Sequence, residues 1–339
     1  MQQKTRKIFL SVLPFFAVFI PILLGLPQSA QALEERELIP VGRTVGVTMD
    51  TEGLLVLGTG SVVGADNENH EPSKGILKIG DRILQANDEE QENKEAFMET
   101  IQQSEGKPIR LRLERNGRQK EVKITPVLSN TAQTYQIGAW IRDSIQGIGT
   151  VTYYDTENGS FGALGHGVYD VDTDELMVIH GGAVVDTSLT EIVKGEKGTA
   201  GELVGQVELQ ERLAAIEKNT ETGIYGKAEE GVFAGESYPV AAKAEVKKGA
   251  AVLLSDLEGN GVQAYALQIE SIEKDGGKHH KDMTIRITDE RLLALTGGIV
   301  QGMSGSPILQ NGKLVGAVTH VTLADAAKGY GIFMENMIE

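Results

Sequence analysis

Ser304 is the residue best suited to covalent chemistry in this chain. It lies in the turn Gly-Met-Ser-Gly-Ser-Pro, between two apolar, β-like runs of the stretch GGIVQGMSGSPILQNGKLVGAVTH. A serine hydroxyl is a weak nucleophile at neutral pH, and it becomes reactive beside a general base that is itself oriented by an acid. In a tight turn the N–H groups of Gly302 and Ser304 can point the same way, toward a developing oxyanion. The pattern predicts a nucleophile loop, with a plain structural turn as the alternative.

The general base is expected at His166, in the segment SFGALGHGVYD. Glycines on both sides leave an imidazole accessible and allow another part of the chain to approach it. A surface turn is the alternative reading of this position. Because His320 ends an apolar, strand-like run, it is the second candidate. The remaining histidines lie in charged loops or beside a pair of glycines: His70, His180, His279 and His280.

The acid that would orient this base is not determined by chain position. Asp170, Asp172 and Asp174 lie closest to His166 in the sequence. Distance in space, however, decides which carboxylate reaches an imidazole. The residues alone therefore leave the acid open.

The segment from Asn130 onward must position these groups. Short β-like runs alternate with glycines and turns throughout it, and helical periodicity is weak, visible only around Asp289–Leu295. The 41 glycines of the chain favour tight turns over long helices. We therefore expect a mostly β fold whose larger domain, residues 129–339, is an antiparallel β-barrel or a pair of barrels.

A smaller domain is expected before it, at residues 40–128. The stretch RTVGVTMDTEGLLVLGTGSV holds two short strand-like runs around a turn at 51–53, and LKIGDRILQAND follows. Asn93 is a suitable N-cap for a helix with one apolar face, and Asn116–Gly117 fits the turn of a closing hairpin. This order of elements, with LKIGDRILQAND as its most specific part, resembles a small α/β PDZ domain.

The PDZ resemblance implies a peptide ligand. PDZ domains bind an extended peptide by adding it to a sheet edge beside a helix. By resemblance, a loop would hold the peptide with its N–H groups, and that loop consists of Gly53, Leu54, Leu55 and Val56. Leu55 stands where the commonest loop has a second glycine, so recognition of a free C-terminus stays open. The ligand is open among a substrate, a membrane protein and the chain's own N-terminal region, and we favour self-association that controls self-cleavage.

The first residues have the order of an export signal. Basic residues at positions 4, 6 and 7 precede an uncharged, mostly apolar run from Ile8 to Pro27, and small residues alternate in the Ser-Ala-Gln-Ala that follows. The run is also nearly long enough to span a bilayer. Residues 1–33 are thus predicted to be a signal peptide or a membrane anchor, and the remainder is expected outside the cytoplasm.

The composition of the chain disfavours or excludes several kinds of ligand and catalytic group. The formal net charge of −16 disfavours binding to the phosphates of nucleic acid. The chain has no cysteine, which excludes thiolate catalysis, cysteine-based zinc sites and disulfides. Acyl transfer through a serine needs neither a metal nor an organic cofactor, so none is expected.

Three segments carry a closer resemblance: GALGHGVYD, ITDERLLALTGGIVQGMSGSPILQNGKLVGAVTHV and GYGIFMENM. Together with the apolar N-terminus and the PDZ-like domain, they resemble the SpoIVB-type serine peptidases, the family of stage IV sporulation protein B. The resemblance runs over the whole chain and implies a chymotrypsin-like peptidase domain. It also implies a protein exported into the space between forespore and mother cell, which processes itself and cleaves a membrane-bound regulator so that a mother-cell sigma factor is activated late in sporulation.

Carried onto this sequence, the family's motif implies Ser304 as nucleophile, His166 as base and Asp289 as acid. The order histidine, aspartate, serine matches that of chymotrypsin. Asp289 is unusually near the serine for that order, and an N-cap of the helix that follows is its alternative role. Hydrolysis would run through an acyl-enzyme whose oxyanion is held by the Gly302 and Ser304 amides.

Two other functions stay open at this stage. One is a PDZ scaffold or adaptor with an inactive peptidase-like domain, which the presence of all three residue types disfavours. The other is a general quality-control protease of the trypsin–PDZ type. In that type the PDZ domain follows the peptidase domain, whereas here it precedes it, which favours the sporulation family.

Overall fold

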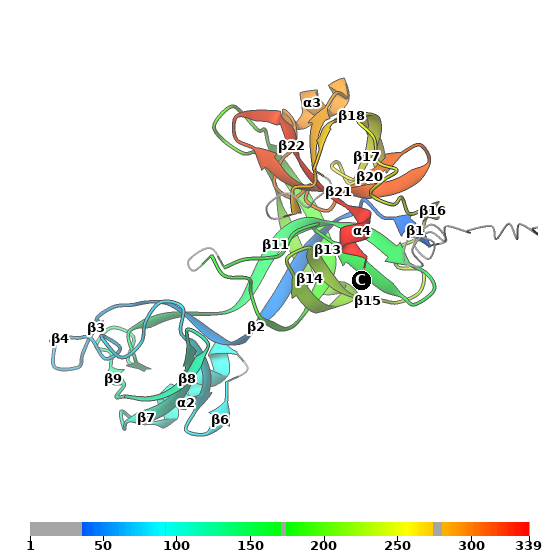
Figure 1. Ribbon diagram of the computed structural model, residues 1–339. Helices are drawn as coiled ribbons and strands as arrows, with labels where there is room; N and C mark the ends of the chain where they lie inside the picture. The colour runs from blue at the N-terminus through cyan, green and yellow to red at the C-terminus, as the bar shows by residue number, and fades with distance from the viewer. Residues whose placement is uncertain (1–35, 92, 171–173, 274–279, 339) are drawn as a thin grey trace, which may run out of the picture.

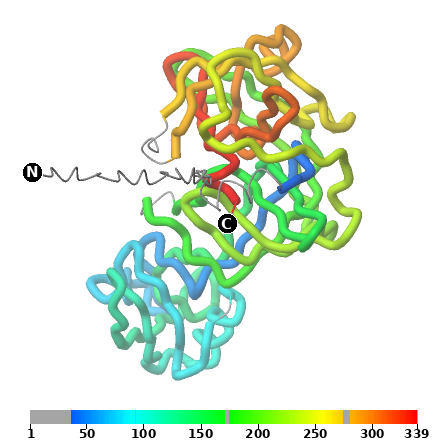
Figure 2. The backbone as a smooth tube through the Cα atoms, turned by 45° about the vertical axis from the view of Figure 1, so that its right-hand side comes forward, coloured from blue at the N-terminus to red at the C-terminus, as the bar shows by residue number. Residues whose placement is uncertain are grey.

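The computed structural model describes residues 36–91, 93–170, 174–273 and 280–338. Within those ranges no helix is both long enough and apolar enough to cross a bilayer. The signal or anchor predicted at residues 1–33 lies outside the described residues. Strands dominate the fold, and the tube trace of Figure 2 shows three bodies: a PDZ-like domain in cyan and two barrels beyond it.

The first barrel is a closed ring of antiparallel strands. Its members are β2 (Thr44–Thr59), β11 (Ala139–Asp155), β12 (Ser160–Ala163), β13 (Ile179–Val193), β14 (Glu202–Thr220) and β15 (Gly223–Ala228). The ring runs β2–β11–β12–β15–β14–β13 and closes where β13 pairs with β2. Its interior is apolar, because Val45, Val151 and Phe161 are fully buried.

The second barrel is also closed. Its strands are β17 (Gly249–Ser255), β18 (Gln263–Ile272), β19 (Met283–Ile287), β20 (Pro307–Gln310), β21 (Lys313–Thr322) and β22 (Asp325–Phe333). They pair in the order β17–β18–β19–β22–β21–β20. Helix α3 (Glu290–Thr296) lies between β19 and β20 at the top of Figure 1, and α4 (Met334–Met337) follows β22. The predicted chymotrypsin-like pair of β-barrels and the short helix near Asp289 are confirmed.

A short sheet and a buried cluster join the two barrels. Strand β1 (Glu37–Pro40) pairs with β11 on one edge and with β16 (Tyr238–Pro239) on the other. Apolar side chains of both barrels and their flanking elements pack together in one cluster: Leu38 of β1, Tyr153 and Tyr225 of the first barrel, Leu314 and Ile332 of the second, and Met337 of α4. The barrels therefore share one seam, and groups on their facing loops keep a fixed relation.

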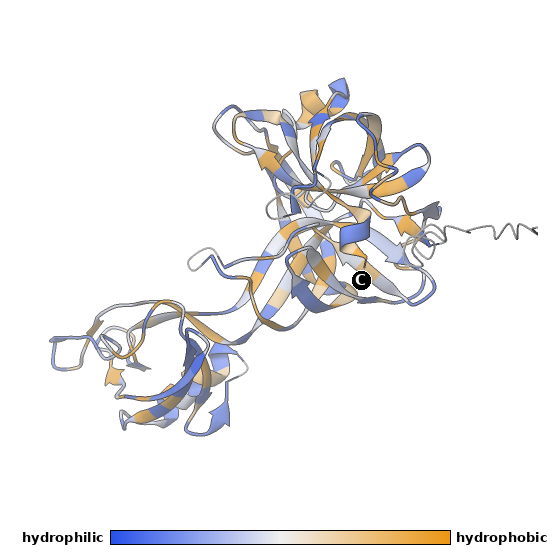
Figure 3. Ribbon diagram, in the orientation of Figure 1, coloured by the Kyte–Doolittle hydropathy of each residue, from blue (hydrophilic) through white to orange (hydrophobic). Residues whose placement is uncertain are grey.

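The PDZ-like domain has its own core. Besides parts of β2 and β11 it holds β3 (Val62–Val63), β4 (Asn69–His70), β5 (Arg82–Ala86), β6 (Glu89–Glu90), α2 (Lys94–Gln103), β7 (Ile109–Arg115), β8 (Arg118–Ile124), β9 (Val127–Leu128) and β10 (Tyr135–Gln136). As predicted, Asn93 caps α2, whose Phe97 and Ile101 are buried, and Asn116–Gly117 turns the β7–β8 hairpin. The edge strand β8 is mostly hydrophilic (Figure 3), which keeps the sheet from adding further strands.

This domain is inserted between two strands of the first barrel. The chain enters it through β2 and leaves it through β11, and these two long strands pair on both sides of the junction. On the barrel side Asp50 pairs with Ser144, and on the PDZ side Leu55 pairs with Arg142. The turn expected at 51–53 is thus a bulge inside β2, and it does not separate two strands.

Strand pairing places the domain boundaries elsewhere than the expected 40–128 and 129–339. Residues 44–50 belong to the first barrel, where they pair with β11 and β13. Residues 139–142 pair with the PDZ half of β2 and so extend the PDZ sheet. Pairing between segments so distant in the chain leaves no local pattern from which the boundaries could have been read.

Candidate active site

Ser304 lies in the loop between α3 and β20. Helix α3 ends at Thr296, and its C-cap, Gly297, adopts the left-handed conformation typical of that position. Gly302 and Gly305 also have positive φ angles, 98° and 96°, so the tight turn depends on its glycines. The side chain of Ser304 is half-buried, and its hydroxyl donates to the carbonyl oxygen of Thr319 at 2.8 Å.

Thr150 of the first barrel holds this loop in place. Its amide donates to the Ser304 carbonyl oxygen at 3.0 Å, and its hydroxyl donates to the Gly302 carbonyl oxygen at 2.8 Å. A Cβ on Gly305 would collide with the Thr150 carbonyl oxygen, so only glycine fits where the two barrels approach. The nucleophile loop is therefore fixed by the opposite barrel as well as by its own.

The end of the β13–β14 hairpin supports the same loop from another side. Gln301 N donates to Gly201 O at 2.8 Å, and Leu203 N donates to Gln301 O at 2.9 Å. The Leu203 side chain lies so close to Gly302 that a Cβ there would be 2.8 Å from it. Contacts on both sides keep the backbone before Ser304 rigid.

The two expected oxyanion donors are not engaged within the protein. Across the described ranges, neither the Gly302 amide nor the Ser304 amide donates to a protein acceptor. Buried N–H groups usually have a partner, and unpaired ones cluster at functional sites. Both amides thus remain able to bind a substrate oxygen.

His166 follows β12 in the first barrel. Its Nδ1 lies 2.8 Å from the carbonyl oxygen of Gly167, and a carbonyl only accepts, so Nδ1 carries the proton. This assignment leaves Nε2 as the basic nitrogen. Burial lowers the pKa of His166 below its ordinary value, and the hydrogen bond that Nδ1 donates to the Gly167 carbonyl opposes part of that shift. The imidazole is therefore neutral near neutral pH, as a general base must be.

Asn219 of β14 anchors the loop that carries His166. Its side chain accepts from Val168 N at 2.9 Å and donates to the carbonyl oxygens of Val168 and Met177 at 2.8 and 3.0 Å. Val168 is two residues from His166, so the amide of Asn219 limits movement of the imidazole. Sequence reasoning did not find this residue, because nothing in its own neighbourhood marks it.

Three consecutive residues of β21 bring the two halves of the site together. Val318 O accepts from Gly305 N at 2.8 Å and would lie 3.2 Å from a Cβ on Gly165. Thr319 O accepts the Ser304 hydroxyl. The His320 ring lies 5.0 Å from the His166 ring, centroid to centroid. The Ser304 loop and the His166 loop therefore both contact this segment of β21, and the catalytic pairing of Ser304 with His166 stays a prediction.

The Asp289 carboxylate binds groups of α3 and β18. Its carboxylate caps α3 by accepting from the amides of Arg291 and Leu292, and it also accepts from Ala266 N at 3.1 Å. The Arg291 guanidinium, 2.9 Å away, and these amides hold the pKa of Asp289 well below its usual range. None of these partners is His166. The structure thus favours the alternative role, a helix cap.

Of the other acidic candidates, Asp170 is engaged elsewhere. Asp170 is buried and its carboxylate pairs with Arg142 at 3.2 Å. For Asp174 the structure shows a backbone bond, from its amide to the Asp170 carbonyl oxygen, which leaves the role of its carboxylate open. Asp172 lies outside the described residues. His320, the second candidate for the base, lies next to His166, with the two ring centroids 5.0 Å apart.

Of the four residues expected to hold a PDZ ligand, Leu54, Leu55 and Val56 are paired within the sheet, and Gly53 lines the cleft described below. Leu54 and Leu55 pair with β5 on one side, while Leu55 and Val56 pair with β11 on the other. Leu54 and Val56 are fully buried, and Val56 N donates to Asp81 O at 2.8 Å. The sheet position at these residues is filled by the chain's own segment 139–142.

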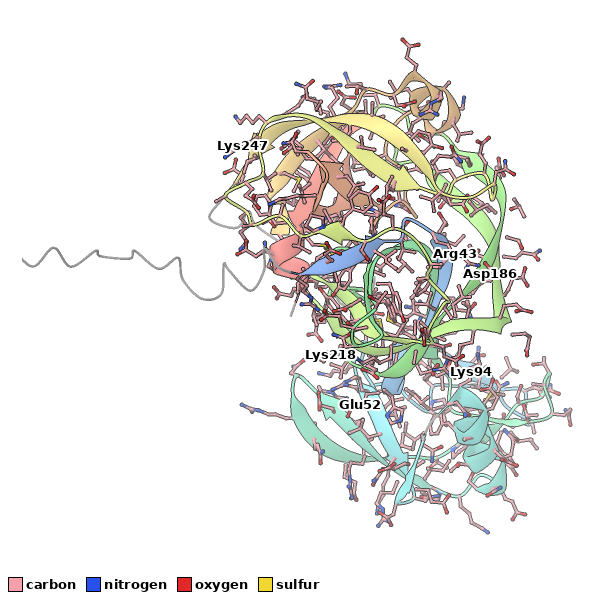
Figure 4. All side chains as sticks on the ribbon, turned by 90° about the vertical axis from the view of Figure 1, so that its right-hand side faces the viewer. Arg43, Glu52, Lys94, Asp186, Lys218 and Lys247 are labelled. Atoms are coloured by element: carbon pink, nitrogen blue, oxygen red, sulfur yellow. The ribbon has the colours of Figure 1, made fainter. Side chains whose placement is uncertain are left out.

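An acidic cleft of about 730 Å³ opens where the PDZ-like domain meets the first barrel. Figure 4 shows Glu52 and Lys94 at this junction. Four carboxylates line the cleft together with Arg112 and His180; they belong to Asp50, Glu52, Glu90 and Asp143. A peptide's terminal carboxylate would meet like charges here, which disfavours recognition of a free C-terminus at this end of the domain.

Two antiparallel β-barrels with a glycine-rich serine loop on one and a histidine on the other form the architecture of chymotrypsin-like serine peptidases. The sequence model of the family described as SpoIVB peptidase S55 matches residues 133–338, more than half of the chain. The protein belongs to this family and is a serine peptidase, which confirms the resemblance drawn from its motifs.

Several solved structures are similar to parts of the chain. The PDZ domain of the SdrC-like protein from Listeria monocytogenes is 19% identical with a TM-score of 0.22, over 26% of this chain and 87% of that one. Two inactive forms of Rv3671c from M. tuberculosis, one a serine-to-alanine mutant and the other described as a protease, are each 15% identical. Their TM-scores are 0.30 and 0.29, over 55% of this chain and 76% and 79% of theirs. A search of curated proteins found no match.

Proposed function

We propose that this serine peptidase is an exported endopeptidase of sporulation. It processes itself and cleaves a membrane-associated regulatory protein, and this cleavage activates a mother-cell sigma factor pathway. It acts in the space between forespore and mother cell and is held at a membrane until it is processed. Membership of the SpoIVB peptidase S55 family and the export-like pattern of residues 1–33 support this proposal.

The peptidase chemistry rests on one observation, that Val318–His320 touch both the Ser304 loop and the His166 loop. In the proposed reaction Ser304 Oγ leaves the Thr319 carbonyl and attacks a peptide carbonyl carbon, while His166 Nε2 takes its proton. The Gly302 and Ser304 amides bind the oxyanion. His166 then protonates the leaving amine, and water attacks the ester formed on Ser304 to release the second product.

The third part of the machinery is the group that orients His166. In this structure the acceptor of its Nδ1 proton is the Gly167 carbonyl. We therefore assign the orienting role to that carbonyl. Asp289, which the family motif marks as the acid, contributes by capping α3, the helix that leads into the Ser304 loop.

Self-processing gives the most direct test of Ser304. The full chain is prepared as wild type, as Ser304→Ala and as Ser306→Ala, and new termini are mapped by mass spectrometry after incubation. Ser306 is a matched control, because it is a buried serine of the same turn whose hydroxyl contacts only Ser255 among the described residues. We expect new internal termini in wild type and in Ser306→Ala, and none in Ser304→Ala.

The Ser304→Ala chain should fold normally. The hydroxyl lost is half-buried and makes one hydrogen bond, which is worth about 1 kcal/mol. Circular dichroism and thermal unfolding check this point. Cleavage by folded Ser304→Ala at the wild-type rate would rule out Ser304 as the nucleophile.

A further inference from the structure

Strand β11 connects the PDZ-like domain to the catalytic loops. Just before it, Tyr135 is held by α2: the side-chain amide of Gln102 donates to Tyr135 O at 2.8 Å and accepts from Tyr135 N at 2.9 Å. Ile137 is buried in the PDZ core, and Ala139 and Ile141 pack against that core. The first part of this segment is therefore a fixed component of the PDZ-like domain.

The same strand then reaches the His166 loop. Arg142 pairs with Leu55 in the PDZ half of β2, and its guanidinium binds the carboxylate of Asp170 at 3.2 Å. The Asp170 side chain is only 4% exposed. Asp170 lies four residues after His166, in a narrow loop where Met177 N donates to Val168 O. Arg142 thus binds the loop at Asp170, and Asn219 binds it at Val168, nearer to His166.

Further along, β11 reaches the other half of the site through Thr150, which binds the Gly302 and Ser304 carbonyl oxygens. One continuous strand, Ala139–Asp155, therefore contacts the PDZ core, the His166 loop and the Ser304 loop in turn. Loss of an ion pair with a buried carboxylate is destabilising, so a displacement of Arg142 weakens its contact with Asp170 and disturbs the loop there.

We propose that Arg142 is a positioning residue of the active site and that it couples the state of the PDZ-like domain to the placement of His166. This inference rests on the proposed role of His166 as general base. A binding partner of the PDZ-like domain that shifts residues 135–142 would change the Arg142–Asp170 ion pair. The imidazole then moves relative to Ser304, and the rate of acyl transfer changes.

The first test compares two ion pairs of similar burial. Arg142→Gln removes the pair described above, and Arg36→Gln removes the Arg36–Asp155 pair, which is 2.7 Å apart and whose carboxylate is 2% exposed. The Asp155 carboxylate binds Arg36 and the neighbouring turn at Glu157 and Asn158, away from the His166 loop. Ser304 is labelled in the full chain with diisopropyl fluorophosphate, and the second-order rate is measured. We expect a drop of about 10- to 100-fold for Arg142→Gln and no change for Arg36→Gln, since small misplacements of catalytic groups cost this much. Arg142→Lys, which keeps the charge, should recover part of the rate.

The second test asks whether the PDZ-like domain acts through this residue. Gln102→Ala releases Tyr135, and Gln103→Ala, at the exposed neighbouring position, is its control. Gln102→Ala should slow labelling in an otherwise wild-type chain, and it should have little further effect in the Arg142→Gln chain. Labelling of Arg142→Gln at the wild-type rate would overturn the proposal. The proposal would also be overturned if the rate loss of the double variant equalled the product of the two single losses. Independent sites add in free energy, and their rate factors therefore multiply.

A separate readout distinguishes this inference from the proposed function. If wild-type Ser304 does not label, or if His166→Ala labels as fast as wild type, the catalytic assignment fails. The NMR resonances of the His166 ring report the position of the loop without any catalysis. They should shift in Arg142→Gln and in Gln102→Ala but not in the two control variants, and unchanged resonances would refute the coupling.

Discussion

Asp289 and His166 show how contacts at single residues decide chemical roles. The carboxylate of Asp289 already accepts from Arg291 and from the amides of Ala266 and Leu292. The imidazole of His166 has a carbonyl at Nδ1 and burial around it. These contacts imply a helix-capping role for Asp289 and a general-base role for His166, and each role can be tested.

Replacing Asp289 separates a capping role from a catalytic one. Asparagine caps helices about as well as aspartate, whereas alanine costs about 0.5–2 kcal/mol of stability. We expect Asp289→Asn to keep most of the Ser304 labelling rate and Asp289→Ala to lower both stability and rate. A triad acid would instead lose about 10⁴-fold in the asparagine variant. Thermal unfolding and labelling are measured together, with Glu290→Gln, an exposed neighbour, as control.

The lowered pKa of His166 predicts activity at mildly acidic pH. A general base works in its neutral form, and burial keeps this imidazole neutral at a pH where an ordinary histidine is protonated. The acid limb of the Ser304 labelling rate should therefore lie below the usual histidine value of about 6.5. The unfolded chain binds this proton more readily, so stability falls as the pH drops from that ordinary value through the lower pKa of the folded state. An acid limb at or above the ordinary value would contradict the assignment.

At the scale of elements, β11 matters because one face of it supports the nucleophile loop. Thr150 and Thr152 are both fully buried on this strand, yet their hydroxyls differ in hydrogen bonding. The Thr150 hydroxyl binds the Gly302 carbonyl, whereas the Thr152 hydroxyl has no hydrogen-bond partner among the described residues. The same chemical change at the two positions thus tests the strand's role.

Thr150→Val should destabilise the protein by about 1–3 kcal/mol, because it leaves a buried carbonyl unsatisfied. It should also slow the labelling of Ser304, since the loop loses one of its supports. Thr152→Val should change stability by no more than about 0.5 kcal/mol in the destabilising direction and leave the rate unaltered. Chemical denaturation and labelling check both variants, and equal effects at the two positions would show that the Gly302 contact is unimportant.

Elements with local signals were predictable from the sequence. Helix α2 has its cap at Asn93, and the β7–β8 hairpin has Asn116–Gly117, so a few neighbouring residues determine each. The long strand β2 was read as two runs around a turn, because residues 51–53 do bulge but pairing with β11 carries the strand through. Tertiary pairing overrode a local turn signal there.

At the scale of the whole molecule, the active site belongs to neither barrel alone. His166 and Thr150 come from the first barrel, and Ser304 and Thr319 come from the second. Ser304, in a glycine-rich turn, and His166, between two glycines, could be recognised in the sequence, since their surroundings need unusual backbone freedom. Thr150, Asn219 and Arg142 could not, because their roles exist only through contacts with residues far away in the chain.

The buried seam that includes Leu38, Tyr153 and Ile332 sets the spacing between these two halves. The PDZ-like domain can also affect the position of these halves, since its sheet includes part of β11. The molecule is thus one peptidase unit with an inserted domain. A simple pair of domains joined by a linker would lack these shared strands.

The position of the PDZ-like domain between β2 and β11 also bears on the order in which the chain folds. The two strands are neighbours in the barrel, but the whole inserted domain separates them in sequence. Closing a loop costs more entropy as the loop lengthens, and non-local strand pairing is slow for this reason. A folded insert brings Asp50 and Ser144 side by side and removes much of that cost. We therefore expect the barrel that carries His166 to close after the insert has folded, so that a chain halted midway through folding would hold no competent proteolytic centre.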